Sequence, residues 1–366
     1  MKPYFTVPAD FSSTVLPSYA EGSLKIPVRE VYGSLKNLPI GGGRHSSVLP
    51  DCDEEMLTEY IKEASRLGIH FNYLVNASCM SALELTSEGQ KQIGAMLEML
   101  LQCGVRRLTI SLPPLADFVF LHYPEFDVWL SVISGITSRT HLKRITENRP
   151  FCGIYLHEKL HRDLKHLAEV CDECRIRKME VGMIVNTLCD ADCPYRQFHY
   201  DLVSHTLPGQ KEMPNLWYYG TVCKLRRLMD PKQVLRLPWV RPDDLPRYVE
   251  LGVSRFKLAG RDLCKFGADF ARTVADYNSA HFRGELSSLF LCYADVERRG
   301  VYNLGNTPRL SEYLEANFSG ELNCLECSDC GRCAELAAEI APRPEIREKY
   351  LSLYRKRRQR AMNLFE

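Results

Sequence analysis

The sequence has no long hydrophobic run and no excess of charge of either sign. Its apolar stretches fall far short of the roughly 20 residues that a membrane-spanning helix requires. The 366 residues carry a formal net charge of only +1, so the chain as a whole is not attracted to nucleic acid or to an acidic membrane surface. Residues 1–5 also lack the apolar segment of a secretory signal peptide. We therefore expect a cytoplasmic protein that does not bind a membrane.

Peptidase motifs are equally scarce. The sequence has no Gly-x-Ser-x-Gly motif of the kind that presents a catalytic serine. A histidine–glutamate pair at His157 and Glu158 is followed by His161, and we attribute this arrangement to chance rather than to a zinc site. Internal repeats and low-complexity tracts are also absent. The length is that of one large domain or two modest ones.

Cysteine, by contrast, is abundant, with 15 residues in the chain. Because the cytosol disfavours disulfides, clustered cysteines there indicate metal binding or redox chemistry. We expect the scattered residues Cys52, Cys103, Cys152 and Cys292 to be small buried hydrophobic side chains. Two groups remain as candidate metal ligands, namely Cys189, Cys193 and Cys223, and the C-terminal run of Cys324, Cys327, Cys330 and Cys333.

The C-terminal run has two residues between successive cysteines. Such spacing is typical of iron–sulfur clusters, whereas a structural zinc site more often uses two separated pairs. Cys189 and Cys193 follow a predicted strand, but two cysteines cannot hold a four-iron cluster, so Cys223 is the natural third ligand. A fourth ligand could be Cys174, Cys264 or a member of the C-terminal run. The sequence leaves open whether the chain holds one shared 4Fe-4S cluster or two.

Apolar segments alternate with helical patterns along most of the chain. The predicted strands are residues 28–35, 69–76, 107–112, 127–134, 153–156, 179–186 and 254–259, and the predicted helices include 54–66, 87–103, 160–174 and 243–251. This alternation indicates parallel βαβ units. We expect an α/β protein with a TIM-like (β/α)8 barrel over residues 1–280, an open doubly wound sheet being the alternative. Residues 281–366 form a C-terminal extension with the cysteine-rich run and a terminal helix.

Functional residues of such a barrel lie at the C-terminal ends of its strands. Lys257 and Arg261 flank Gly260 after the last predicted strand. This cation pair could hold a carboxylate or phosphate, or it could form salt bridges to a barrel helix. Arg196 and His199 follow Cys193 closely enough to lie beside a cluster. The full set of candidate substrate-binding residues is Lys257, Arg261, Arg196, His199, Arg241, Asn76 and Asn186.

Four segments together resemble the collagenase-like peptidase family, peptidase family U32. They are Leu74-Val-Asn-Ala-Ser-Cys79, residues 186–199, Trp239-Val-Arg-Pro-Asp-Asp-Leu245 and Gly252-Val-Ser-Arg-Phe-Lys-Leu-Ala-Gly-Arg261. The resemblance is to a branch from anaerobes with a terminal cysteine-rich run, and it implies a TIM-like barrel. It also implies an iron–sulfur protein that assists oxygen-independent hydroxylation of ubiquinone precursors or RNA bases, with prephenate implicated as oxygen donor. This sequence lacks the spacing of four barrel cysteines in those members, so the resemblance extends to the cluster but not to the substrate.

Three functions therefore follow from the sequence. The first is an iron–sulfur redox enzyme, such as an oxygen-independent hydroxylase, acting on a small organic or nucleic-acid substrate. The second is an accessory electron-transfer or scaffold protein that acts in a complex, with a protein partner or as a homo-oligomer. The third is a collagenase-like peptidase. The basic segment Arg355–Arg360 could contact RNA, although the apolar side of its helix favours docking onto the barrel.

Overall fold

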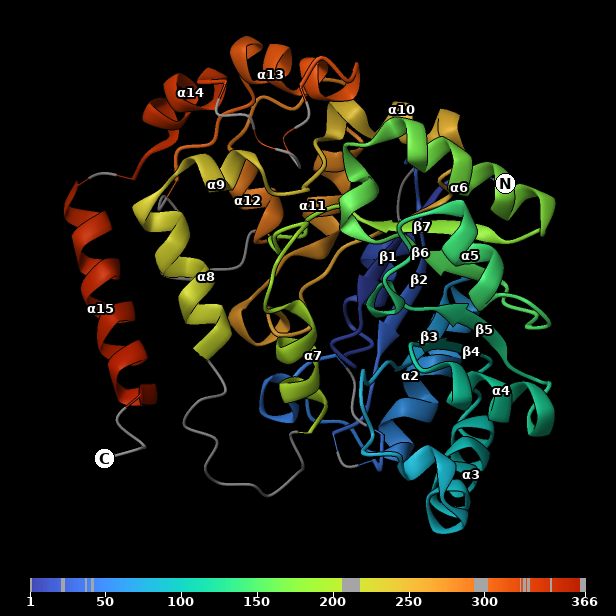
Figure 1. Ribbon diagram of the computed structural model, residues 1–366. Helices are drawn as coiled ribbons and strands as arrows, with labels where there is room; N and C mark the ends of the chain where they lie inside the picture. The colour runs from blue at the N-terminus through green and yellow to red at the C-terminus, as the bar shows by residue number, and fades with distance from the viewer. Residues whose placement is uncertain are drawn as a thin grey trace.

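The computed structural model in Figure 1 describes most of the chain. The described residues are 2–20, 24–36, 38–40, 43–205, 218–292, 302–322, 324, 327, 330–342 and 344–362. Within them no helix is both long enough and apolar enough to cross a membrane.

Eight parallel strands close into a barrel in which each strand pairs with the next and β8 pairs with β1. The strands are β1 (Tyr4–Pro8), β2 (Val28–Gly33), β3 (His70–Val75), β4 (Arg107–Ile110), β5 (Asp127–Leu130), β6 (Gly153–Tyr155), β7 (Glu180–Ile184) and β8 (Arg255–Lys257). The predicted TIM-like (β/α)8 barrel is therefore confirmed, and closure excludes the open sheet. β1 was not among the predicted strands, and the predicted strand 127–134, which is β5, ends at Leu130 because the chain turns into a short 3-10 helix at Val132–Ser134.

Helices surround the barrel, as Figure 1 shows. Those in the barrel sequence are α1 (Leu16–Ala20), α2 (Glu54–Arg66), α3 (Ser87–Gln102), α4 (Pro113–His122), α5 (Arg139–Ile145), α6 (Leu164–Ile176), α7 (Arg196–Ser204), α8 (Tyr218–Met229), α9 (Lys232–Leu235), α10 (Leu245–Leu251) and α11 (Phe270–Tyr277). Side-chain caps start several of them: Asp53 accepts a hydrogen bond from the backbone N–H of Met56 at the start of α2. The left-handed Gly252 ends α10 and leads into β8.

Large side chains fill the barrel interior, and two glycines make room for them. Trp129 of β5 and Tyr155 of β6 are both almost fully buried, with ring centroids 5.4 Å apart. A Cβ atom on Gly153 would lie 2.5 Å from the Trp129 ring, and one on Gly182 would lie 2.8 Å from the Tyr155 ring. The core is thus a packed one, as in other barrels of this class, and not a pore.

The C-terminal extension packs against the barrel and shares its core. Its helices are α12 (Leu286–Phe290), α13 (Pro308–Phe318), α14 (Arg332–Ile340) and α15 (Pro344–Met362). Leu286, Leu310 and Leu336 belong to the same buried apolar cluster as the barrel residues. In Figure 1, α15 lies alongside α8, and Tyr350, Leu351 and Tyr354 pack there against Leu225 and Leu228. The apolar side of the terminal helix therefore docks, whereas the basic residues 355–360 are exposed.

Candidate functional site

The three cysteines Cys189, Cys193 and Cys223, here called the barrel cysteines, come together in space. Cys189 and Cys193 lie in the segment that follows β7, and Cys223 lies in the second turn of α8. The thiol of Cys193 is in hydrogen-bonding contact with both of the others. The contact with Cys193 is the main cause that lowers the pKa of Cys223 to about 7, with Arg227 adding to it against burial. The structure therefore brings these three side chains together beyond the end of a strand, as we expect from the sequence.

Two arginines hold the segment that carries Cys189. Arg196, the first residue of α7, forms an ion pair with the buried Glu158 and donates a hydrogen bond to the backbone carbonyl of Asp190. Arg227 of α8 donates a hydrogen bond to the carbonyl of Leu188. The charge of Arg196 acts on Cys189, and the charge of Arg227 acts on Cys223. Positive charge therefore lies close to the barrel cysteines, although the contact with Cys193 and burial still hold the pKa of Cys189 well above its usual value.

A second group lies at the end of β8, where Lys257 and Arg261, here called the mouth cations, are 7% and 5% exposed. The ammonium of Lys257 lies over the ring faces of Tyr32 and Tyr155, at 3.8 Å and 4.6 Å from the ring centroids. Arg261 donates a hydrogen bond to Ser34 Oγ at 2.8 Å. Burial, and then the charge of Arg261, hold the pKa of Lys257 well below its usual value. Burial likewise lowers the pKa of Arg261 to about 10.

The loop after β2 brings a further cation to this end of the barrel. Asn76, just beyond β3, accepts a hydrogen bond from the backbone N–H of Gly43 at 2.9 Å. This contact holds the neighbouring Arg44, whose charge acts on Tyr32, Lys257 and Arg261. Arg44 itself pairs with Asp262 at 3.5 Å. Asn76, which the sequence analysis predicts to bind substrate, therefore positions this loop.

Helix α7 carries two half-buried side chains near Cys189 and Arg44. Its Tyr200 has a pKa raised by burial and then by Glu158 and Cys189, while Arg196 and Arg44 oppose the rise. Burial, together with the charges of Arg44 and Lys224, lowers the pKa of His199 to about 4, so this imidazole is neutral at pH 7. Tyr200 therefore lies close enough to both Cys189 and Arg44 for their charges to act on it.

Two of the predicted substrate ligands have other roles. The amide of Asn186 bonds the backbone of Ala259 in both directions, at 2.7 and 2.8 Å, and so fastens the end of β7 to the end of β8. Arg241 is 5% exposed and binds both carboxylate oxygens of Asp244 at 2.9 Å. Its remaining nitrogen donates to Asn306 and Ser311. Four of its five N–H donors are used within the protein, so Arg241 serves the structure here and its binding of substrate stays a prediction.

The candidate fourth ligands Cys174 and Cys264 lie in other surroundings. Cys174 is fully buried on α6, and its charged neighbours are Cys171, Glu173 and Arg177. Cys264 responds to Asp10, Asp262 and Arg261, on the side of the barrel where the chain leaves β8. Neither residue has a barrel cysteine among the groups that shift its pKa.

The C-terminal cysteines surround a different arginine. Arg236, directly after α9, donates to Cys327 Sγ at 2.9 Å and to Cys333 Sγ at 3.7 Å. Cys324 Sγ lies 3.3 Å from the hydroxyl of Tyr313, and Cys330 is exposed. In the described part of the chain, the buried Nε atoms of Arg236 and of nearby Arg162 have no hydrogen-bond partner. Across those same residues, no set of three or more Cys, His, Asp or Glu side chains has the geometry of a metal site.

Residues His157–His161 have the spacing of the zinc-peptidase motif His-Glu-x-x-His, which makes their local structure decisive. That motif needs an α-helix to place both imidazoles on one face, but here Glu158–His161 is a short 3-10 helix. Glu158 is paired with Arg196, and the fully buried His161 contacts the carbonyl of Pro238 through Nδ1. Burial lowers the pKa of His161 to about 4. The segment therefore does not form a zinc-peptidase centre.

Sequence reasoning missed several residues of this region, chiefly Tyr32, Arg44, Glu158, Tyr200 and Arg236. The strand-end rule could have found Tyr32 and Glu158, because they lie at or just beyond the ends of β2 and β6. Arg44 follows a run of three glycines after β2, which marks a close-packed loop. Nothing local in the sequence marks Tyr200 or Arg236, since their roles depend on how α7 and α9 pack.

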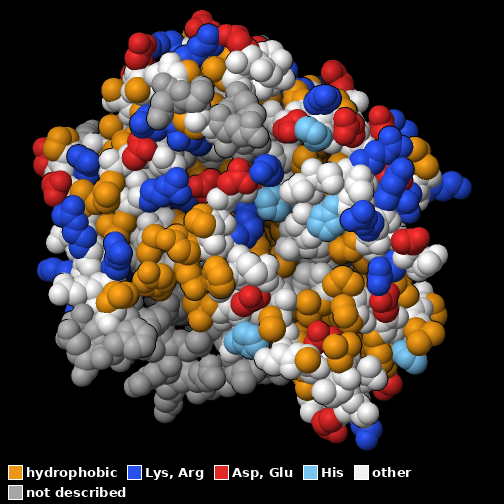
Figure 2. Space-filling view, viewed as in Figure 1, with side chains coloured by type: hydrophobic (Ala, Val, Ile, Leu, Met, Phe, Trp, Pro, Cys, Tyr) orange, Lys and Arg blue, Asp and Glu red, His pale blue; other side chains and the backbone are white. Residues whose placement is uncertain are grey.

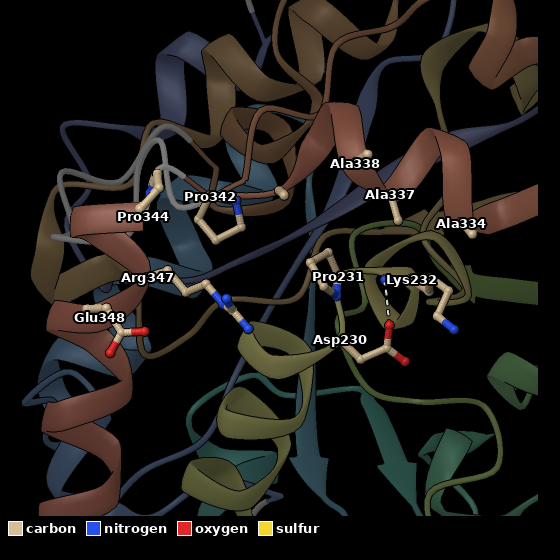
Figure 3. Close-up of a pocket in the computed structure, with 11 residues that line it drawn as sticks. Asp230, Pro231, Lys232, Ala334, Ala337, Ala338, Pro342, Pro344, Arg347 and Glu348 are labelled. Carbon is tan, nitrogen blue, oxygen red and sulfur yellow. Dashed lines mark hydrogen bonds between the residues drawn. The ribbon is translucent and has the colours of Figure 1, made fainter.

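Two cavities lie outside the strand-end region. One, of about 430 Å³, is bounded by α9, α14 and α15, with Lys232 and Arg347 among its lining residues (Figure 3). A narrower one, of about 120 Å³, lies beside the barrel cysteines and is lined by Leu188, Phe290 and Tyr354 together with Lys224 and Arg227. Figure 2 shows apolar side chains gathered on this face over α8.

The closed barrel defines the protein as a TIM-like (β/α)8 protein. Its groups of cysteines and cations lie at the strand ends. No protein-family model matches the chain. The chain is 26% identical over 304 residues to "Uncharacterized protease MJ1657" of Methanocaldococcus jannaschii, covering 82% of this chain and 86% of the relative. Its fold is similar to that of the U32 peptidase Mk0906, with a TM-score of 0.50 and 15% identity over 71% of this chain and 93% of that one. The chain is thus similar in sequence to a protein named as a protease, and its likeness to the U32 peptidase structure is one of fold.

Proposed function

We propose that the chain is an iron–sulfur redox enzyme whose barrel cysteines hold a 4Fe-4S cluster beside a substrate at the strand ends. The observation that carries the proposal is the contact of Cys193 with both Cys189 and Cys223, in the segment after β7 and on α8. Oxygen-independent hydroxylation of a small organic or nucleic-acid substrate is the reaction that the family resemblance favours.

The residues present fit such a cluster in donor type and in charge. Thiolates are the ligands of iron–sulfur clusters, and a cluster with its thiolates is anionic, so nearby guanidinium groups stabilise it. Arg196 and Arg227 are placed to do this. A bound cluster would supply one-electron chemistry, while the neutral His199 and the buried Tyr200 would border the substrate from α7.

We further propose that the C-terminal cysteines hold a second, separate cluster. The support is electrostatic: among the described residues no carboxylate lies within 4.0 Å of Arg236 or Arg162. The sulfur atoms of Cys327 and Cys333 are the groups that Arg236 contacts. The charged neighbours of the barrel cysteines, Arg196 and Arg227, are different ones. Two clusters therefore account for the charges better than one shared cluster.

The accessory-protein alternative is favoured by one observation, the exposure of Cys327 and Cys330, which would let a partner protein exchange electrons with the second cluster. The peptidase alternative has the names of the relatives behind it. The geometry of His157–His161 argues against a zinc mechanism. Incubating the protein with denatured collagen, with and without chelator, tests the peptidase alternative directly.

The proposal is tested by anaerobic purification followed by iron and sulfide quantification and EPR. Cys193→Ala and Cys330→Ala each remove one proposed ligand, and Cys52→Ala is the matched control because Cys52 lies in neither group. We expect each ligand variant to lose part of the iron and a different EPR signal, with the control unchanged. A single shared cluster would lose all signal in both variants. Iron-free wild-type protein would refute the proposal.

A further inference from the structure

The cavity of about 120 Å³ beside the barrel cysteines lies where the C-terminal extension meets α8. Helices α8, α12 and α15 contribute to its wall, together with Leu188 from the segment after β7. Most of the wall is apolar, and its side chains Leu228, Phe290 and Leu304 are buried. Because an apolar cavity of about 150 Å³ admits benzene, this cavity has the size for a single ring.

Positive charge lies on one part of the wall. Lys224 and Arg227 are half-buried, one turn apart on α8, and both line the cavity. Arg227 donates a hydrogen bond to the carbonyl of Leu188, and in the described part of the chain no carboxylate lies within 4.0 Å of its guanidinium. Its other N–H donors are therefore available to a ligand. The ammonium of Lys224 lies 5.5 Å from the ring centroid of Tyr354.

Two tyrosine hydroxyls lie beside this charge. Tyr302 and Tyr354 both line the cavity, and Tyr354 is only 5% exposed. Among the described residues neither hydroxyl has a hydrogen-bond partner, although a hydroxyl that is removed from water normally gains one. Burial raises the pKa of Tyr302, Arg227 opposes the rise and Tyr354 adds to it, so these three groups lie close together.

We propose that this cavity binds a small aromatic monocarboxylate, with its carboxylate facing Arg227, Tyr302 and Tyr354. A carboxylate accepts about four hydrogen bonds, and the guanidinium and the two hydroxyls supply donors for them. The ring packs against the apolar part of the wall. A neutral ring would leave the guanidinium without an anion, and a fused ring system is too large for about 120 Å³.

The site goes beyond the proposed function, because its wall consists of protein side chains and needs no cluster. It also lies next to the barrel cysteines in sequence, since Leu188 precedes Cys189 and Lys224 follows Cys223. A ligand that binds only the folded protein raises its stability. Here it would fasten the extension to the helix and the segment that carry these cysteines.

The test is isothermal titration calorimetry of sodium benzoate on the full-length, anaerobically purified protein. Benzamide has the same shape without the charge, and acetate has the charge without the ring, so both are ligand controls. Lys224→Gln and Tyr354→Phe are test variants. Arg226→Gln is the matched control, because Arg226 lies on the same helix but is exposed and pairs with Asp190 at 3.4 Å. Arg227 is left unchanged because it also holds the segment after β7.

We expect benzoate to bind, and benzamide and acetate to bind at least about tenfold more weakly. Lys224→Gln should weaken benzoate binding about tenfold and Tyr354→Phe about threefold to tenfold, whereas Arg226→Gln should change it less than about twofold. Leu291→Phe adds a ring at a half-buried position of the wall and should abolish binding. If that variant folds poorly by circular dichroism, the two polar variants still decide the question.

A crystal structure of the benzoate complex completes the test, with the ring expected against Leu228, Phe290 and Leu304. The proposal is overturned if benzoate does not bind, if benzamide binds as tightly, or if Arg226→Gln weakens binding as much as Lys224→Gln. Benzoate bound elsewhere on the protein also overturns it. Iron quantification on the same samples keeps the two proposals apart, because cluster-containing protein that does not bind benzoate refutes only this site.

Discussion

Buried charges are paired at one end of the barrel, whereas at the other end they have no carboxylate partner among the described residues. Toward the start of the strands, Glu30 lies between Arg107 and Arg255, and it also accepts hydrogen bonds from Asn72 and Thr6. At the end of β8, Lys257 and Arg261 are nearly as buried but have no carboxylate of their own among the described residues. The first arrangement is a network of paired charges, whereas the second leaves two buried cations without a carboxylate partner.

The difference shows why burial of charge alone does not identify a functional site. Arg255 is 1% exposed, yet it pairs with Glu30, stacks on Trp129 at 3.3 Å and donates to Tyr4. Lys257 lies two residues after Arg255 on β8, and its ammonium packs against the ring faces of Tyr32 and Tyr155. What distinguishes the end of β8 is that, among the described residues, Lys257 has no carboxylate partner.

The largest effect is expected at the structural end, from Glu30→Gln. The substitution leaves the buried Arg255 without its carboxylate partner, so we expect the free energy of unfolding to fall by about 3–5 kcal/mol. Urea denaturation followed by circular dichroism measures it. A loss of unfolding free energy below about 1 kcal/mol would mean that the charged groups at the two ends of the barrel do not differ in this way.

An effect of opposite sign is expected at the mouth. Lys257→Met removes an uncompensated cation while keeping a long apolar side chain against Tyr32 and Tyr155. We expect the free energy of unfolding to rise by about 1–3 kcal/mol, measured by the same urea denaturation without added anions. Equal destabilisation by Lys257→Met and Glu30→Gln would contradict the comparison.

The pH dependence of stability should follow from Lys257 as well. Burial holds its pKa well below the usual lysine value, so between its folded pKa and that usual value the unfolded chain binds the extra proton. Stability therefore rises with pH in this window and is lost as pH falls through the folded pKa. The difference in unfolding free energy between Lys257→Met and wild type should shrink as pH rises. A pH-independent difference would show that Lys257 is not destabilised by burial.

The smallest effect is expected from Asp262→Asn. This residue pairs at 3.5 Å with Arg44, and both side chains are more than one-third exposed. We expect a change of about 0–1 kcal/mol in unfolding free energy, because solvent screens such a pair. A larger loss would place Arg44 and Asp262 with the buried network, and a thermal melt of the variant beside wild type decides between the two.

The fold could largely be predicted from local signals, because strands such as 69–76 and 179–186 are apolar runs bounded by helix stops. β1 was missed since Tyr4–Pro8 is short and ends in proline, and only pairing with β2 and β8 makes it a strand. The strand-end rule located Lys257 and the barrel cysteines. It did not reveal that Arg241 bonds Asn306 and Ser311, which are far along the chain.

Contacts between residues that are distant in sequence also explain the other features that the sequence analysis missed. Arg236 meets Cys327 and Cys333 across more than 90 residues, a contact that no local pattern predicts. Asn186 was placed correctly at a strand end, but only the structure shows its amide bound to Ala259. The cofactor and the cytoplasmic location remain predictions from the sequence.

The most direct test of the account is a crystal structure of the anaerobically purified protein with anomalous diffraction collected at the iron absorption edge. The account predicts an iron peak among the sulfur atoms of Cys189, Cys193 and Cys223, and a separate one at Cys324–Cys333. A structure with the three barrel thiols together but no iron between them, in crystals of protein that was never exposed to oxygen, would contradict it.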